Sequence, residues 1–115
     1  MARVAIEGDE LVVRLRWLEK LGAFRSNVRV PLAAIRDVRV ATHPWAELRG
    51  IRAPGTGFPG LISLGTRRGR SGKDFAAVYR RTAAVVIELE GAGFRRLVVS
   101  AADPEGMAAR VARSS

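Results

Sequence analysis

The first forty residues alternate between apolar and polar side chains, with the period of two that is typical of a β-strand with one buried face. In LVVRLRW, residues 11–17, the apolar side chains at every second position face away from Arg14 and Arg16. The segment RVAIE, residues 3–7, precedes it across a Gly-Asp pair at 8–9 that suits a tight turn. We therefore expect a hairpin of two antiparallel strands.

The alternation continues in two shorter segments. SNVRVPL, residues 26–32, predicts a brief strand that stops at Pro31, because proline has no backbone N–H to donate. AAIRDVRVAT, residues 33–42, predicts a bent strand that is entered through a turn. Between these strands and the first hairpin, WLEKLGAF, residues 17–24, suits either a helical turn or a loop that ends near Gly22.

From residue 42 to residue 73 the alternation gives way to a segment with three prolines, seven glycines and one brief apolar stretch, GLISLG. Such a density of glycine and proline is typical of turns, bulges and close backbone approach. We expect residues 42–73 to be the least regular part of the molecule, with a strand at LISLG.

Strands resume in DFAAVYRR, AVVIELE and FRRLVVS, which are separated by turns at residues 82–83 and 91–93 and predict an antiparallel meander. The last segment predicts a helix, since Asp103 suits an N-cap and Pro104 the first helical position. The apolar face of this helix contains Met107, Ala108, Val111 and Ala112.

Length and composition indicate one globular domain over residues 1–115. A chain of 115 residues can bury a single core, and 48% hydrophobic with 27% charged residues is typical of a folded protein. The absence of cysteine excludes disulfides, thiolate metal sites and cysteine nucleophiles. The order of elements predicts a mainly β fold: about seven antiparallel strands in a bent sheet or small barrel, closed by one C-terminal helix.

No segment of the sequence has the pattern of a signal peptide or a membrane span. The longest apolar runs, FAAVY and AAVVI, have five residues each, far below the roughly 20 that a spanning helix needs. Glu7, Asp9 and Glu10 interrupt the N-terminal region before an apolar signal segment forms. We expect a cytoplasmic protein, with peripheral contact to a membrane as the alternative.

Four segments resemble bacterial pleckstrin-homology-like (PH-like) domains. VRVPLAAIRDVRV is similar to a strand, turn and strand of that family, and PGLISLGT, TAAVVIELEG and LVVSAADPEGMAARV are similar to its second half. The resemblance covers most of the chain, and it rests on apolar spacing and turn residues. It implies a binding scaffold for lipid headgroups, peptides or assembly, and it brings no catalytic residues. The first turn of this chain is acidic, with Glu7, Asp9 and Glu10, unlike the basic phosphoinositide motif of eukaryotic PH domains.

Two glycine-rich motifs resemble nucleotide sites in their letters alone. GTGFPG, residues 55–60, matches G-x-G-x-x-G, but Pro59 lies inside it and LISLG after it favours a strand, whereas a dinucleotide needs a helix N-terminus there. RRGRSGKD differs from a P-loop at two mechanistic positions, Arg67 and Asp74. We expect neither a dinucleotide nor any other cofactor.

Metal and catalytic sites have little support. His43 is the single histidine and precedes Pro44 in a turn-like context, so that a solvated or capping role is favoured over a metal site. Glu88 and Glu90 share one strand face, and we favour ion pairs with arginines of a neighbouring strand over a catalytic carboxylate pair. No pairing of a nucleophile with a base is apparent, and we expect no enzyme.

The formal net charge is +9, which favours encounter with polyanions such as nucleic acid or an anionic membrane. The basic residues with most functional weight surround one loop and the strand after it, and are candidate anion ligands: Arg49, Arg52, Arg67, Arg68, Arg70, Lys73, Arg80 and Arg81. A surface of this kind binds phosphates with strong salt dependence. Two alternatives stay open, a solvated loop without a partner and a general arginine bias in composition.

Trp45, in the loop HPWAEL, is a candidate interface residue, although a tryptophan that covers an open end of the core is the favoured alternative. The sequence thus predicts a non-enzymatic PH-like binding or protein-interaction module, whose partner is another protein or a second copy of the chain. The alternative function is peripheral binding of anionic lipid or nucleic acid through the arginine-rich loop.

Overall fold

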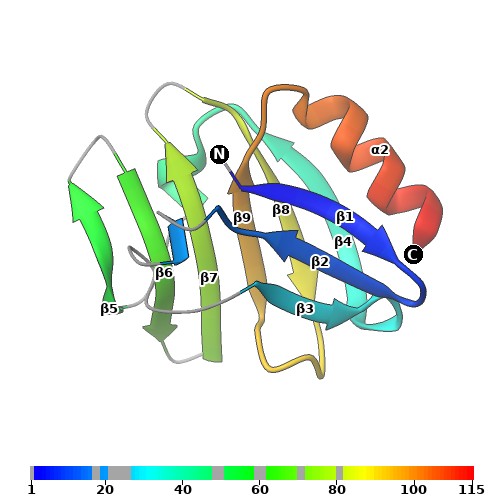
Figure 1. The fold of residues 1–115 in the computed structure, drawn as a ribbon, viewed down its shortest axis with the longest axis horizontal. Coiled ribbons are helices and arrows are strands. Elements are labelled where there is room, and N and C mark those ends of the chain that lie inside the picture. Colours follow the sequence, from blue (N-terminus) through cyan, green and yellow to red (C-terminus); the bar gives the residue numbers. More distant parts are fainter. Residues whose placement is uncertain are drawn as a thin grey trace.

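The computed structural model describes residues 2–16, 19–20, 27–47, 51–58, 62–69, 72–79 and 82–115. These residues form a mainly β fold of two sheets and one C-terminal helix (Figure 1). The smaller sheet has the strand order β1-β2-β3 and the larger one has the order β4-β8-β9-β7-β6-β5.

The smaller sheet confirms the predicted N-terminal hairpin. It consists of β1 (Arg3–Glu7), β2 (Glu10–Arg14) and β3 (Val28–Pro31), all antiparallel. Gly8, with φ +62°, supplies the left-handed backbone of the β1–β2 turn. The register places Arg3 opposite Arg14. Strand β3 ends at Pro31, as predicted.

The larger sheet begins with the predicted bent strand. A 3₁₀ turn, η1 (Leu32–Ala34), leads into β4 (Ile35–Ala41), whose register shifts between Ile35 and Asp37 where it pairs with β8 (Ala84–Leu89). A register shift of this kind bends a strand and increases its twist. The prediction of a bent strand entered through a turn is therefore confirmed.

The predicted meander is wrong. Strand β9 (Arg96–Ser100) lies between β8 and β7 (Gly72–Tyr79), antiparallel to β8 and parallel to β7. The reason is burial on both faces, since Leu97, Val98 and Val99 are all at most 1% exposed. A strand that is apolar on both faces is stabilised in the middle of a sheet, and a local turn signal carries no information about that position.

The predicted barrel and the count of about seven strands are also wrong. The described strands form separate sheets of three and six strands, stacked face to face over β4, β8 and β9 (Figure 1). A barrel buries only one face of each strand, whereas the central strands of the larger sheet bury both. The smaller sheet covers one face of the larger sheet, and Trp45 packs against the apolar cluster on the other.

The segment expected to be least regular contains a long hairpin. Strands β5 (Ile51–Phe58) and β6 (Ile62–Gly69) pair antiparallel, and β6 pairs in turn with β7. The predicted strand at LISLG is confirmed by β6, but the irregularity predicted for residues 42–73 is wrong over the positions that β5 and β6 occupy. Glycine permits sharp bends inside strands, and the register of β5 and β6 shifts between Arg52 and Gly55.

The main core lies between the two sheets. Leu11, Val13 and Val30 from the smaller sheet face Phe75, Ile87 and others from the larger one. A second apolar cluster lies on the opposite face of the larger sheet, and its buried members are Ala41, Ala76, Val78, Ala84, Val86 and Val98. The outer face of β8 is thus partly apolar, with Ala84 and Val86 in this cluster.

The C-terminal helix forms where it was predicted. In α2 (Pro104–Ser114) the N-cap Asp103 accepts a hydrogen bond from the N–H of Gly106 at 3.1 Å. Val111 is fully buried, whereas Ala112 is exposed, so the buried face is narrower than expected. The helix lies along the outer edges of β1 and β4, where Arg110 Nη2 donates to the carbonyl of Val4 at 3.2 Å (Figure 1). Within the described residues, no helix is long and apolar enough to cross a membrane.

Candidate anion-binding site

The structure brings together only part of the predicted arginine cluster. Arg68 on β6 lies opposite Lys73 on β7, and Arg67 lies opposite Asp74. The Lys73 ammonium lies 4.8 Å from the centre of the Phe94 ring, a cation–π contact. Arg95, which sequence reasoning did not include, joins this end of the hairpin through a hydrogen bond from its N–H to the Lys73 carbonyl at 2.6 Å.

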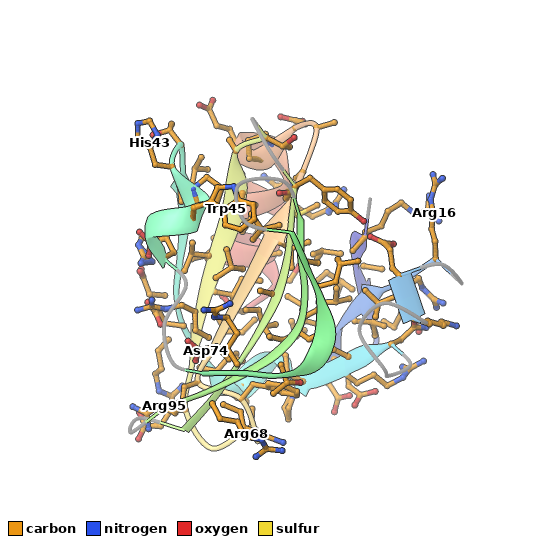
Figure 2. All side chains as sticks on the ribbon, turned by 90° about the vertical axis from the view of Figure 1, so that its left-hand side faces the viewer. Arg16, His43, Trp45, Arg68, Asp74 and Arg95 are labelled. Atoms are coloured by element: carbon orange, nitrogen blue, oxygen red, sulfur yellow. The ribbon has the colours of Figure 1, made fainter. Side chains whose placement is uncertain are left out.

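The other predicted anion ligands add no side-chain contact to this cluster in the described part of the chain. Arg52 lies in β5, where its backbone is in register with Arg67. The rest lie outside the described residues: Arg49, Arg70, Arg80 and Arg81. We call Arg67, Arg68, Lys73 and Arg95 the hairpin-end cluster; Arg68 and Arg95 lie together at the lower end of the sheet in Figure 2.

Both glycine-rich motifs lie at the ends of strands. Gly55 to Phe58 belong to β5, and the next described element is another strand, β6. RRGRSGKD joins the end of β6 to the start of β7. Neither motif precedes a helix, so the arrangement that a dinucleotide or P-loop site requires is missing from these described strands.

Trp45 lies in the 3₁₀ turn η2 (Pro44–Glu47) and His43 directly before it, on the outer side of the larger sheet (Figure 2). Trp45 is partly buried and packs against the second apolar cluster, and His43 is exposed. Across the described part of the chain, no three His, Cys, Asp or Glu side chains come close enough to hold a metal ion.

Glu88 lies in an ion-pair network on the outer face of the larger sheet. Arg96 Nε donates to both carboxylate oxygens of Glu88 at 3.0 and 3.1 Å, and its Nη1 donates to the Glu47 carbonyl at 2.9 Å. Arg39 pairs with both glutamates. Glu90, directly after β8, pairs with Arg36 on β4. The prediction that these carboxylates face arginines of neighbouring strands is confirmed.

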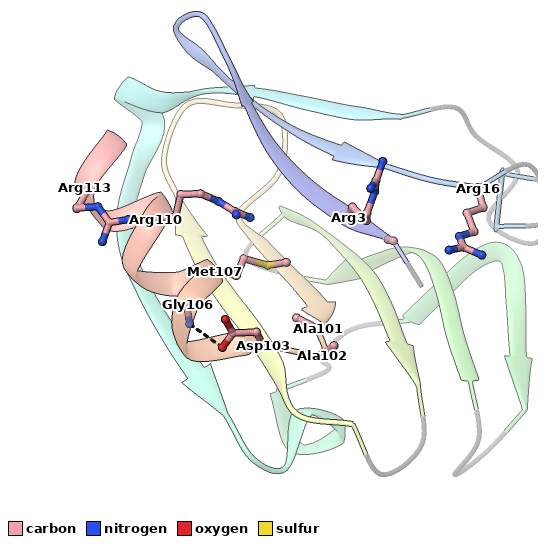
Figure 3. Close-up of a pocket in the computed structure, with 10 residues that line it drawn as sticks. Arg3, Arg16, Ala101, Ala102, Asp103, Gly106, Met107, Arg110 and Arg113 are labelled. Carbon is pink, nitrogen blue, oxygen red and sulfur yellow. Dashed lines mark hydrogen bonds between the residues drawn. The ribbon is translucent and has the colours of Figure 1, made fainter.

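A concave surface among the described residues lies beside α2, away from the predicted cluster. Three adjoining hollows of about 460, 600 and 390 Å³ share Arg3 as a lining residue. The first lies between the start of β1 and the first turns of α2, the second follows β1 along the helix, and the third lies beyond β2 toward Lys20. Figure 3 shows the first hollow, with Met107 and Arg110 extending from the helix toward β1. We call the three hollows together the helix groove.

The helix groove is strongly basic. Its charged lining comprises six cations and one carboxylate: Arg3, Arg14, Arg16, Lys20, Arg110, Arg113 and Asp103. Asp103 is engaged as the cap of α2. Among the described residues, neither Arg3, Arg16, Lys20 nor Arg113 forms an ion pair. Like charges held together in this way favour the binding of an anion that neutralises them.

The outer face of the smaller sheet is polarised between its two ends. At the hairpin end, Glu7 pairs with Arg14 and Arg29, and Glu10 pairs with Arg29. At the opposite end, Arg3 and Arg16 pair with no carboxylate of the residues that the structure describes. Glu7 therefore neutralises one cation of the groove, Arg14, whereas Arg3 and Arg16 keep their positive charge without a carboxylate partner among the described residues.

A buried carboxylate connects the groove to the larger sheet. Glu19 is only 4% exposed. Its Oε2 accepts a hydrogen bond from the Tyr79 hydroxyl at 2.5 Å, and its Oε1 accepts one from the backbone N–H of Arg16 at 2.8 Å. Burial raises the pKa of Tyr79 above its usual value, and the hydrogen bond and negative charge of Glu19 raise it further against a smaller lowering by Arg16. Glu19 therefore favours the neutral phenol.

Sequence reasoning missed the groove because its residues are far apart in the chain. Arg3 and Arg14 are neighbours only through the β1–β2 register, and Arg110 reaches β1 from 106 positions away. One signal was present: Arg14 and Arg16 share the polar face of the predicted strand at 11–17. Comparison with known proteins gave no match to a family model, a curated protein or a solved structure.

Proposed function

We propose that this protein is a non-enzymatic binding module that takes the phosphate groups of an anionic partner in the helix groove. The observation that carries the proposal is a set of four cations, unpaired within the described part of the chain, around adjoining hollows that share Arg3. Phosphate oxygens are the natural complement of such a set, since guanidinium groups bind them in pairs of parallel hydrogen bonds.

The groove is better suited to this role than the hairpin-end cluster. Lys73 already contacts the Phe94 ring, and Arg67 and Asp74 both have interactions with other groups. Asp74, which is 4% exposed, also places a carboxylate among those cations. An anion bound at the hairpin end would compete with these existing contacts of Lys73 and Arg67, whereas the groove cations Arg3, Arg16, Lys20 and Arg113 form no ion pair among the described residues.

The rival function is docking of another protein along an exposed strand. Helix α2 lies along the outer edges of β1 and β4. The outer edges of β3 and β5 pair with no described strand, and each of these strands contains a proline, Pro31 and Pro54. Proline lacks the N–H that strand addition uses, so this rival has less support.

The PH-like assignment stays part of the proposal. A C-terminal helix that follows a series of strands supports it, whereas the parallel β7–β9 pair and the two separate sheets differ from the all-antiparallel fold that the resemblance implies. Binding in the helix groove does not depend on this assignment.

The test is binding of a single-stranded oligothymidylate and of vesicles containing phosphatidylserine, each across a salt series. We expect binding that weakens steeply with salt. Replacing Arg3, Arg16 and Arg113 together by alanine should weaken oligonucleotide binding about tenfold or more, and reduce the salt slope by about 0.7 for each phosphate that the variant no longer neutralises. Binding to the oligonucleotide alone, to the vesicles alone or to both would show whether the phosphate comes from nucleic acid, from lipid or from either.

The matched control removes the same charge elsewhere. Arg68, Lys73 and Arg95 changed together to alanine also lower the net charge by three, and should leave the salt slope close to that of the wild type. Equal losses in the two triple variants would show that only overall charge matters and would overturn the groove. Loss of binding in the control variant alone would show that the hairpin-end cluster, and not the groove, is the binding site.

A further inference from the structure

Arg16 and Lys20 lie beyond the end of β2, where, of the residues that the structure describes, the buried side chain of Glu19 makes a hydrogen bond to the opposite sheet. Glu19 accepts the Tyr79 hydroxyl, and Tyr79 belongs to β7 in the larger sheet. The N–H of Tyr79 donates to Ser100 Oγ at 2.9 Å, and Ser100 is fully buried in β9. A chain of hydrogen bonds therefore connects the interior of the larger sheet to Glu19.

The same carboxylate holds the backbone at Arg16, and the Arg16 backbone in turn holds that of Lys20. Its second oxygen accepts the N–H of Arg16, and the Arg16 carbonyl accepts the N–H of Lys20 at 2.9 Å. Arg16 and Lys20 both line the third hollow of the groove. Two cations held near Arg3 and Arg14 repel one another, and an anchored carboxylate opposes that repulsion.

We propose that Glu19 is a positioning residue for anion recognition, held by Tyr79, which keeps Arg16 and Lys20 directed at the groove. This inference rests on the proposed function and deepens it. The negative charge of Glu19 has an opposing effect, since it lowers the positive potential at Arg16. Geometry and charge of this one side chain therefore act on anion affinity in opposite directions.

Two substitutions at the same position separate the two effects. In Glu19→Gln the amide oxygen still accepts the Arg16 N–H, and the amide NH₂ group donates to the Tyr79 oxygen. In Glu19→Ala both anchors are lost. The two variants have the same net charge, so any difference between them in binding reports the geometry.

The experiment measures oligothymidylate affinity across a salt series for wild type, Glu19→Gln and Glu19→Ala, with folding checked by circular dichroism. We expect Glu19→Gln to bind two- to fivefold more tightly at low salt, because a nearby negative charge is gone. Glu19→Ala should bind more weakly than wild type, with a salt slope lower by about 1.4, because Arg16 and Lys20 no longer neutralise a phosphate each. Tyr79→Phe, which keeps the carboxylate but removes its donor, should also lower the slope.

The outcomes separate this inference from the proposed function. Identical affinities and slopes for Glu19→Gln and Glu19→Ala, or tighter binding by both, would overturn the positioning role while leaving the groove intact. Wild-type protein that does not bind the oligonucleotide at low salt would overturn nucleic-acid phosphate as the partner of both. If Glu19→Ala does not fold, Tyr79→Phe decides, and an unchanged slope in that variant overturns the inference.

Discussion

The arginines on the outer face of the larger sheet and those of the helix groove differ in their partners. Arg39 and Arg96 share Glu47 and Glu88, and the Arg96 side chain is only 16% exposed. Arg3 and Arg16 are exposed, and within the described ranges they have no carboxylate partner. The first pair stabilises the fold of the protein itself, and the second pair is available to a ligand.

This difference shows that arginine content alone does not locate a binding surface. The net charge of +9 is a property of the whole chain, but whether a given arginine can bind a ligand depends on where the eleven acidic residues lie. The strand pairing places Glu88 opposite Arg96 on β9 and diagonal to Arg39 on β4, and both arginines form ion pairs with it. The fold therefore neutralises charge on one face and concentrates it on another.

The largest expected effect follows from Arg96→Ala. The substitution removes the bonds to Glu88 and to the Glu47 carbonyl, and it leaves partly buried acceptors without their donor. We expect a loss of about 2 to 3 kcal/mol in the free energy of unfolding, measured by urea denaturation, with unchanged oligonucleotide binding. Arg96→Lys is the control, and it should recover part of the stability. A loss below about 0.5 kcal/mol would remove the structural role assigned to this network.

The next effect concerns Tyr79, whose folded pKa is raised above the unfolded value of about 10. Stabilisation from the neutral phenol is therefore complete below pH 10 and is lost as the pH rises above it. The free energy of unfolding should fall by up to about 1.4 kcal/mol per pH unit in that range. Tyr79→Phe should lack this component. Because the chain has one tyrosine, tyrosinate absorbance reports the titration directly; a midpoint near 10 in the folded protein would contradict the expectation.

The smallest expected effects compare two exposed arginines. Arg36 forms an exposed pair with Glu90, and Arg113 lines the groove without an ion-pair partner among the described residues. Alanine at either position should change the free energy of unfolding by no more than about 0.5 kcal/mol. Only Arg113→Ala should lower oligonucleotide affinity. Equal oligonucleotide affinity of both variants would mean that Arg113 is no more available to a ligand than the paired Arg36.

The parts of the fold that follow local rules could be predicted from the sequence. β1 spans the predicted residues 3–7, its turn uses Gly8, and α2 begins after the Asp103 cap at Pro104. Each of these depends on neighbours within a few positions. The place of β9 between β7 and β8 depends on which faces are buried in the assembled sheet, and no local pattern contains that information.

The candidate site shows the same limit more strongly. Grouping cations by closeness in sequence led to the segment at 49–81, whereas the groove joins the first strand, the end of the second and the last helix. The pairing of Glu88 with neighbouring arginines was predictable, because alternation places its side chain on a polar face. Which arginines are left without a partner depends on strand register and helix docking, which only the three-dimensional arrangement supplies.

The central position of β9 has a consequence for the order in which the chain acquires its structure. Strands β7 and β8 are synthesised before β9, the strand that lies between them and pairs with both. Until residues 96–100 insert, two apolar strands have open edges, and this is the situation in which nascent chains depend on chaperones. The larger sheet can therefore be completed only when the last strand is released from the ribosome, and we expect its formation to be a late event in biosynthesis.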